Sequence, residues 1–178
     1  AFGKSADIML IKKSAIGLKP YTSVDESLFL RGGGIAYQFD KIEATVFYSY
    51  NNIDANIDLT DTSTTDQEVL SVTSVQQTGF HRTFNELEDK DAITQSQIGG
   101  HLAYKTRRLN IGITGINTEL NTEFNPSLKT YSQFKNSDNT QTNLGVDYNW
   151  IYRNFNFFGE FSKSLDAGNA FLSGALIT

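Results

Sequence analysis

The feature that most constrains the fold is a strict alternation of side-chain type over residues 143–162. The stretch NLGVDYNWIYRNFNFFGEFS places an apolar or aromatic residue at nearly every second position, pauses at Arg153 and Asn154, and then resumes. Successive side chains of a β-strand point to opposite sides, so this two-residue repeat predicts strands with two unlike faces. The pause is short enough for a tight turn. We therefore expect a β-hairpin here, with Phe158 as the exception on its polar face.

The same test predicts about eight strands along the chain. They are expected near residues 2–18 and 28–39, from Ile42 onward, twice within 97–117, twice within 143–162, and over 167–178. The connections alternate in length. In chain order they are expected to run long, short, long, short, long, short, long: the long ones at 20–27, 57–91, 121–141 and 163–166, and the short ones at 40–41, 105–108 and 153–154. The weak alternation in EVLSVTSV, residues 68–75, suggests that the longest loop extends its hairpin.

This asymmetry of connections predicts the architecture. In an up-and-down antiparallel sheet, odd and even connections lie at opposite ends, so one end carries tight turns and the other carries long loops. Transmembrane β-barrels have this arrangement, with short periplasmic turns and long extracellular loops. We therefore expect an all-β fold: a single domain over residues 1–178, forming an antiparallel up-and-down transmembrane β-barrel or an arc of one.

The composition of the two faces decides their orientation. The polar parity is built from Asn, Gly, Ser, Thr, Gln and single acids, whereas a solvated outer face should be rich in Lys and Glu. We expect six polar side chains to line the lumen: Glu43, His101, Asp147, Asn149, Asn156 and Glu160. Aromatic residues that cluster toward strand ends are expected to form a lipid-facing girdle: Tyr48, Tyr50, Tyr104, Tyr148, Trp150 and Tyr152. Basic residues such as Lys105 and Arg153 fall at the predicted tight turns, outside the apolar band.

Composition excludes several classes of protein. A mean hydropathy of -0.34 would normally indicate a soluble chain, but a membrane barrel exposes apolar residues only at alternate positions and keeps a low average. No apolar run approaches the roughly 18 residues of a spanning helix. There is no cysteine, so disulfides and thiolate chemistry are excluded, and a net charge of -5 argues against nucleic-acid binding. A soluble lipocalin-like barrel, with the same alternation turned inside out, remains the alternative.

Candidate catalytic and metal-binding residues are few. His81 is expected in the outer loop and His101 on the lumenal side of a strand near a tight turn, so the two should not share a metal site. The acidic stretches 51–66 and 85–91 lack the spacing of a calcium loop and are interpreted as solvated loops. An outer-membrane hydrolase built on His81 would need a nucleophile at a defined spacing, which the loops do not supply. We therefore expect no enzyme activity, cofactor or metal.

Four stretches together resemble a known family: KPYTSVDESLFLRGGGIAY, ATVFYSYNNIDANI, TGFHRTFNELEDKDAI and FNFFGEFSKSLDAGNAFLSGAL. They are similar to the barrel portion of large Gram-negative outer-membrane proteins that begin with a helix-hairpin-helix module like that of competence DNA-binding proteins. The resemblance implies a larger barrel, of which these residues are one arc, and it marks no catalytic residue. The module is not among these residues, so no DNA-related role is carried over to them. The final SGALIT, without a terminal aromatic residue, also favours an arc.

These patterns lead to a functional expectation. The chain is predicted to be a porin-like protein of the bacterial outer membrane with a structural, transport or complex-subunit role. Its expected partners are outer-membrane lipid and lipopolysaccharide, together with other outer-membrane or periplasmic proteins. The alternatives are a soluble or surface ligand-binding barrel and, with less support, an outer-membrane hydrolase.

Overall fold

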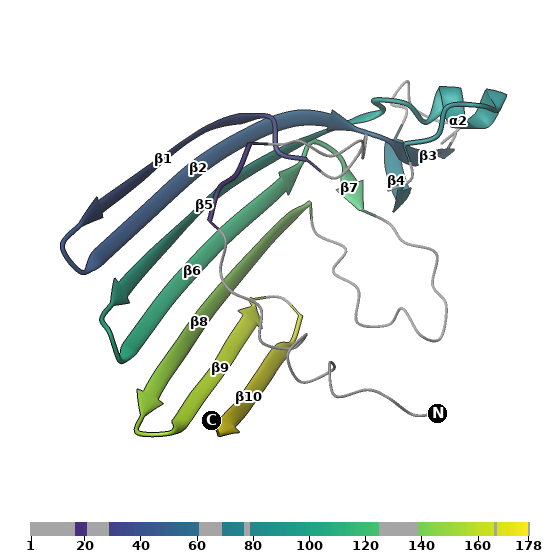
Figure 1. Ribbon diagram of the computed structural model, residues 1–178. Helices are drawn as coiled ribbons and strands as arrows, with labels where there is room; N and C mark the ends of the chain where they lie inside the picture. The colour runs from purple at the N-terminus through teal and green to yellow at the C-terminus, as the bar shows by residue number, and fades with distance from the viewer. Residues whose placement is uncertain are drawn as a thin grey trace.

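The computed structural model describes residues 17–20, 29–60, 69–76, 79–124, 139–165 and 167–177. Its main element is one seven-stranded sheet in the order β1-β2-β5-β6-β8-β9-β10 (Figure 1). The strands are β1 (Gly32–Phe39), β2 (Ile42–Ile53), β5 (Ile93–Lys105), β6 (Leu109–Leu120), β8 (Thr140–Tyr152), β9 (Phe155–Ser164) and β10 (Asn169–Ile177). Every neighbouring pair is antiparallel. The prediction of an all-β, antiparallel, up-and-down sheet is confirmed, and β1 and β10 form its two edges.

Tight turns gather at one end of the sheet (Figure 1). Asp40 and Arg153, which begin the turns β1–β2 and β8–β9, have φ angles of 48° and 53°. Two-residue hairpin turns require a positive φ, because only that backbone geometry matches the twist of the flanking strands. The turn between β5 and β6 is held by Thr106, whose hydroxyl accepts from the backbone N–H of Leu109 at 2.9 Å. The three predicted tight turns at 40–41, 105–108 and 153–154 are thus confirmed.

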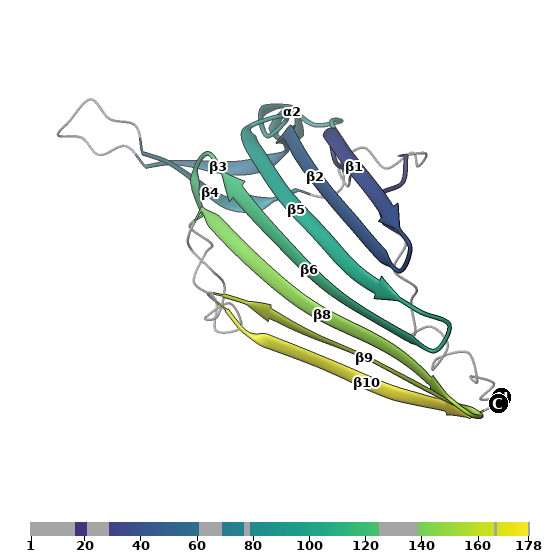
Figure 2. The same cartoon turned by 90° about the vertical axis from the view of Figure 1, so that its left-hand side faces the viewer.

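The longest predicted loop is partly folded. It contains β3 (Ala55–Thr60), β4 (Val69–Val75) and the short helix α2 (Phe84–Glu88). The two strands form a hairpin, and β7 (Glu123–Phe124) adds to β4 as the third strand of a small separate sheet. The weak alternation at 68–75 thus corresponds to a strand, but β4 pairs with β3 in a separate sheet and does not lengthen the β2–β5 pairing, and the helix was not predicted. Figure 2 shows this sheet projecting from the end opposite the tight turns.

A small apolar core joins the two sheets. Ile53, Ala55, Val72 and Ile93 are buried together, with Ala92 and Leu120 packed against them. Ile53 and Ile93 are register partners at the ends of β2 and β5, so the core begins where the main sheet ends. These side chains are apolar, so their burial is favourable and holds the small sheet against the larger one.

Some predicted strand boundaries were wrong. The strand expected from 28 begins only at Gly32, and β5 runs on to Lys105 because this residue still pairs with Asn110. The connection predicted at 163–166 lies further along the chain, because β9 continues to Ser164 and β10 begins only at Asn169. The strand predicted near 2–18 lies outside the described residues except for Gly17 and Leu18, which are not in a strand.

Cross-strand register separates the sheet into two faces. One row on one face is apolar from edge to edge: Tyr37, Ala44, Leu102, Ile113, Val146, Phe161 and Phe171. The adjoining row, on the opposite face, is Gln38, Glu43, Ala103, Gly112, Asp147, Glu160 and Leu172. We call these sides the apolar face and the polar face. Among the described residues, no helix has the length and apolarity needed to cross a membrane.

Candidate functional site: the polar face of the sheet

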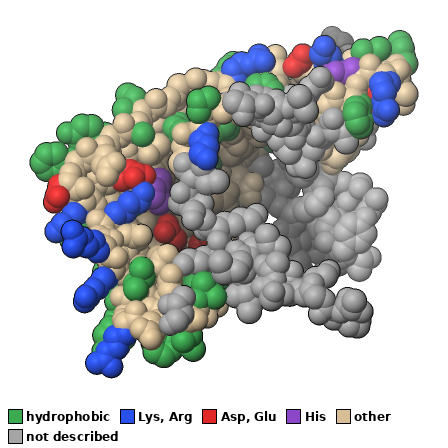
Figure 3. Space-filling model, viewed as in Figure 1, with side chains coloured by type: hydrophobic (Ala, Val, Ile, Leu, Met, Phe, Trp, Pro, Cys, Tyr) green, Lys and Arg blue, Asp and Glu red, His purple; other side chains and the backbone are tan. Residues whose placement is uncertain are grey.

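The six side chains predicted to line a lumen all lie on the polar face. Glu43, Asp147 and Glu160 stand in a single register row across β2, β8 and β9. His101 lies one row toward the loop end, while Asn149 and Asn156 lie toward the tight turns. Figure 3 shows acidic, basic and histidine side chains gathered in the hollow of the curved sheet, with hydrophobic side chains along its outer rim. The structure therefore brings together residues that are up to 117 positions apart in sequence.

His101 and Asp147 meet above Gly112 on the intervening strand. A Cβ atom on Gly112 would lie 2.6 Å from His101 Cε1 and would also overlap Asp147 Oδ1. Both side chains therefore lean over the position where Gly112 has no side chain. His101 Nδ1 is 2.8 Å from the hydroxyl of Thr114, its register partner on β6. The histidine ring contacts Thr114, and its Cε1 edge and the Asp147 carboxylate lie over the same glycine, an arrangement that parity alone does not reveal.

Lys105 and Glu43 form the salt bridge of this face, with Nζ 2.6 Å from Oε2. Lys105 was expected at a turn outside the sheet, but it is the last residue of β5 and reaches back to the polar face. Both side chains are partly exposed, at 44% and 27%, so screening by solvent limits the pair to at most about 1 kcal/mol. Its main effect is to neutralise Glu43.

Asp147 and Glu160 are direct register partners on β8 and β9. Directly opposed like charges destabilise a sheet. Within the described part of the chain, neither carboxylate has an ion-pair partner, and Lys105 pairs with Glu43. The centre of the polar face therefore carries an excess of negative charge, with His101 beside it.

Nearer the tight turns the polar face is rich in amides. The side-chain oxygens of Asn110, Asn149 and Asn156 are buried and make no hydrogen bond with the described residues. Asn110 and Asn149 are register partners, so two of these oxygens lie side by side. Buried polar atoms are normally hydrogen-bonded. These three oxygens are therefore unsatisfied within the described residues.

Two aromatic residues on the polar face pack over glycines. Phe47 covers Gly99, where an added Cβ would lie 2.5 Å from the ring, and Phe158 covers Gly174 at the same distance. Phe158, the exception in the alternation, is only 7% exposed. The missing side chain of a glycine on the neighbouring strand leaves room for each ring. Both phenylalanines therefore pack flat on the polar face, and the alternation of the two faces continues around them. The glycine opposite Phe158 is the sequence signal that could have predicted this.

The six predicted girdle residues all lie on the apolar face, at two levels. Tyr48 and Tyr50 stand toward the loop end, and Tyr104, Tyr148, Trp150 and Tyr152 toward the tight turns. The rings of Trp150 and Phe157 have centroids 5.6 Å apart, and Phe155 stacks on Phe157 at 5.9 Å. Trp150 is nevertheless 45% exposed. Trp150, Tyr152, Phe155 and Phe157 therefore form a cluster of contacting rings on the apolar face.

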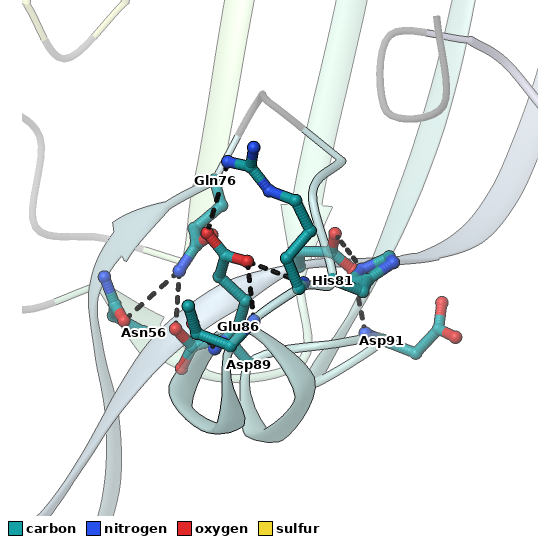
Figure 4. A network of polar contacts seen from close by, with 9 residues as sticks. Asn56, Gln76, His81, Glu86, Asp89 and Asp91 are labelled. Atoms are coloured by element: carbon teal, nitrogen blue, oxygen red, sulfur yellow. Dashed lines mark hydrogen bonds and ion pairs between the residues drawn. The ribbon is translucent and has the colours of Figure 1, made fainter.

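A separate polar network fixes the chain between β4 and β5 (Figure 4). His81 Nε2 lies 2.9 Å from Asp54 Oδ2, and the second oxygen of Asp54 accepts from the backbone N–H of Asp91 at 2.9 Å. Gln76 donates to Asp89 in the same network. The sequence placed His81 in the long connection that precedes β5, as observed, but gave no sign of its pairing with Asp54, which is 27 residues away.

Helix α2 is capped by its own side chains. Thr83 accepts from the backbone N–H of Glu86, and Glu86 in turn accepts from the backbone N–H of Thr83 at 3.0 Å and of Arg82 at 2.7 Å. Because the backbone N–H groups of Arg82 and Thr83 favour the ionised form, they hold the pKa of Glu86 below its usual value. The Thr-x-x-Glu spacing of this capping box is the signal that could have predicted the helix.

Groups of side chains suitable for metal binding are not found in the described ranges: no three His, Asp or Glu residues there could hold an ion. The two histidines lie in different networks, one with Asp54 and the other with Thr114.

Comparisons with known proteins gave no match: no protein family, curated protein or solved structure is significantly similar to the chain. The resemblance to outer-membrane proteins that carry a helix-hairpin-helix module stays a prediction.

Proposed function

We propose that this sheet is part of the wall of an outer-membrane β-barrel, with the apolar face toward lipid and the polar face toward the lumen. The observation that carries the proposal is the edge-to-edge apolar row from Tyr37 to Phe171. Its large side chains are exposed, with Tyr37 at 65% and Phe171 at 72%. Soluble monomers rarely expose contiguous apolar surface on this scale. Lipid is the environment in which such a surface is stable.

The height of the apolar face fits a bilayer. The row that contains Tyr48 and the row that contains Tyr152 are separated by about ten residues along the strands, or roughly 33 Å at about 3.3 Å per residue. Barrel strands tilt by about 40° from the membrane normal, which reduces that length to about 25 Å. This equals the usual height of the lipid-facing band. Aromatic residues at both limits agree with the girdles that flank such bands.

The ends of the sheet support one orientation. Tight turns with Lys41, Arg107, Arg108 and Arg153 lie at one end, and the small sheet and α2 lie at the other. In outer-membrane barrels short turns face the periplasm and long loops face outward. The proposed orientation therefore places α2 and the β3–β4 hairpin outside the cell, where they would meet lipopolysaccharide or partner proteins.

The polar face supports a transport or structural role for the lumen. Its acidic centre favours cations and small polar solutes over anions. Its amide-rich region near the tight turns is suited to water and neutral hydrogen-bonding groups. The soluble lipocalin-like alternative has less support, because a soluble barrel turns the apolar side chains of each strand inward. Here the less exposed parity is the polar one, with Thr45 and Ser49 buried.

The experiment that tests this proposal is the gel mobility of the native protein from an outer-membrane extract, unheated and then boiled in SDS. A heat-dependent shift, together with recovery in the membrane fraction, is the expected result. A boiled mass near 19.8 kDa would mean that these residues suffice for a barrel, and a larger mass would make them one arc of it. Recovery in the soluble fraction with no shift would reject the proposal and favour a soluble binding barrel.

A further inference from the structure

Helix α2 turns its apolar side chains away from the protein. Phe84 and Leu87 are three residues apart and therefore lie on one side of the helix, where they are 75% and 55% exposed. Phe80, just before the helix, is 51% exposed. A surface helix of a soluble domain normally packs its apolar side against the core, whereas no residue of α2 is buried. We call Phe80, Phe84 and Leu87 the α2 patch.

The segment that carries the α2 patch packs on the same side of the sheet as the apolar face. Ile53 and Ala55 are buried in the core between the two sheets, and Ile53 shares the parity of the polar face. Asp54 lies between them, so its side chain points to the opposite side, which is that of the apolar face. This side chain binds His81 and the Asp91 amide, on either side of α2. Figure 3 shows hydrophobic side chains along the outer rim of the sheet and again at the end that α2 occupies in Figure 1.

The height of α2 matches the surface of a bilayer. Asp54, to which the segment is attached, lies four residues beyond Tyr50 of the upper girdle, or about 13 Å along the strand at about 3.3 Å per residue. For a strand tilted by about 40°, this is about 10 Å along the membrane normal. The headgroup layer extends roughly 5 to 8 Å beyond the hydrocarbon. The helix therefore lies at the outer limit of the headgroups, and side chains as long as Phe and Leu reach into them.

Arg82 adds a positive charge to the α2 patch. Its guanidinium carbon lies 4.2 Å from the centre of the Phe80 ring, and its side chain is 69% exposed. Its contact with Glu86 Oε1 is long, at 3.9 Å, and the other oxygen of that carboxylate accepts from the backbone amides of Arg82 and Thr83. A guanidinium beside an exposed ring is suited to a lipid surface, because it can bind a phosphate while the ring enters the apolar layer.

We propose that the α2 patch anchors the chain in the lipid leaflet at the loop end, with its apolar side chains at the boundary of headgroups and acyl chains and Arg82 at a lipid phosphate. Because the apolar face is taken as the lipid-facing side, this anchor rests on the proposed function. In this arrangement the partner of α2 is lipid and not protein. The helix then fixes the height of the sheet in the membrane.

Single-cysteine labelling tests the anchor in the full chain, which has no native cysteine. Leu87→Cys carries an environment-sensitive fluorophore within the α2 patch. Asn85→Cys is the matched control, because Asn85 is exposed but lies on another side of the same helix. Val146→Cys reports separately on the apolar face. Each variant is reconstituted in vesicles of phosphatidylcholine and phosphatidylglycerol that carry a nitroxide quencher either at the headgroups or deep in the acyl chains.

Quenching that depends on depth is the expected result. The Leu87 label should be quenched more strongly by the shallow nitroxide than by the deep one, and several-fold more strongly than the Asn85 label. Equal quenching of the Leu87 and Asn85 labels would overturn the anchor. A Leu87 label that is shielded from a water-soluble quencher, yet quenched by neither nitroxide, would mean that protein, such as a second copy of the chain, covers the patch, and would overturn the anchor as well.

The Val146 label separates the anchor from the proposed function. Quenching of this label by the deep nitroxide supports the lipid-facing wall whatever the Leu87 label shows. If the Val146 label stays unquenched while the Leu87 label is quenched by the shallow nitroxide, the sheet does not lie in the bilayer, but α2 still binds the lipid surface.

Arg82→Gln in the Leu87→Cys chain tests the phosphate contact. Loss of the charge should weaken quenching by the shallow nitroxide, most clearly in vesicles rich in phosphatidylglycerol. Unchanged quenching would overturn the role of Arg82 in the anchor.

Discussion

The ring of Tyr148 on β8 lies across Gly159, its register partner on β9. A Cβ atom at Gly159 would stand 2.6 Å from Tyr148 Cε1 and 2.9 Å from the backbone oxygen of Leu172. Beyond the glycine, the Tyr148 hydroxyl reaches Ser173 on β10 at 3.0 Å. One aromatic side chain thus ties together three strands, including the edge strand, and the missing side chain of Gly159 makes this possible.

Gly159→Ala should destabilise the protein by about 1 to 3 kcal/mol, because the added methyl group overpacks the Tyr148 ring against backbone that cannot give way. Gly145→Ala is the matched control on the adjacent strand. There the nearest atom would be 3.8 Å away, so stability should rise slightly, by less than about 1 kcal/mol. Urea unfolding followed by the fluorescence of Trp150, the single tryptophan, measures both. Equal effects of the two changes would contradict this account of Gly159.

Val146→Arg should cost about 2 to 4 kcal/mol if the apolar face meets mid-bilayer lipid. Asn149→Ser, three residues along the same strand but on the polar face, should be nearly silent because its side-chain oxygen makes no hydrogen bond to the described residues. Unfolding in lipid vesicles gives the two free energies. If both changes were tolerated equally, the proposed orientation of the faces would be wrong.

Asp54→Ala should loosen residues 79–91 from the end of the sheet. The change removes the contact with His81 and the acceptor for the Asp91 amide, a loss of about 1 to 3 kcal/mol in local stability. Hydrogen exchange of the Asp91 amide should accelerate accordingly. Glu88→Ala removes the same charge from an exposed position of α2 and should leave that amide unchanged. Acceleration in both variants would show that net charge, not the Asp54 contacts, controls the segment.

Acid should release the capping box of α2. The pKa of Glu86 is lowered by its bonds to the Arg82 and Thr83 amides, so its contribution is complete above the usual value of 4.5 and is lost as pH falls through the lower, folded-state pKa. The amide resonances of Arg82 and Thr83 should therefore titrate with a midpoint below 4.5. In Glu86→Gln this titration should disappear. A midpoint at or above 4.5 would be inconsistent with the observed hydrogen bonds.

Sequence periodicity predicted local features of the sheet well. Side-chain alternation depends only on neighbours along one strand, so it placed Val146 on the apolar face and Asp147 on the polar face without knowledge of any partner strand. Short interruptions likewise predicted the turns at Asp40 and Arg153, because the hairpin geometry is itself local. The capping box at Thr83 was also present in the sequence, but the surrounding polar composition led to the interpretation of a loop.

The residue pattern by itself determined that the chain forms two-faced antiparallel strands, joined by tight turns at one end and long connections at the other. Only the tertiary structure decided which residues stand opposite one another. Register places Gly159 beneath Tyr148, Gly112 beneath His101 and Asp147, and Asp54 beside His81. Each of these contacts joins residues at least 11 positions apart, and a two-residue repeat fits equally well in any register shifted by two. The packing of side chains against specific glycines is what selects one register, and that selection requires the neighbouring strands to be in place.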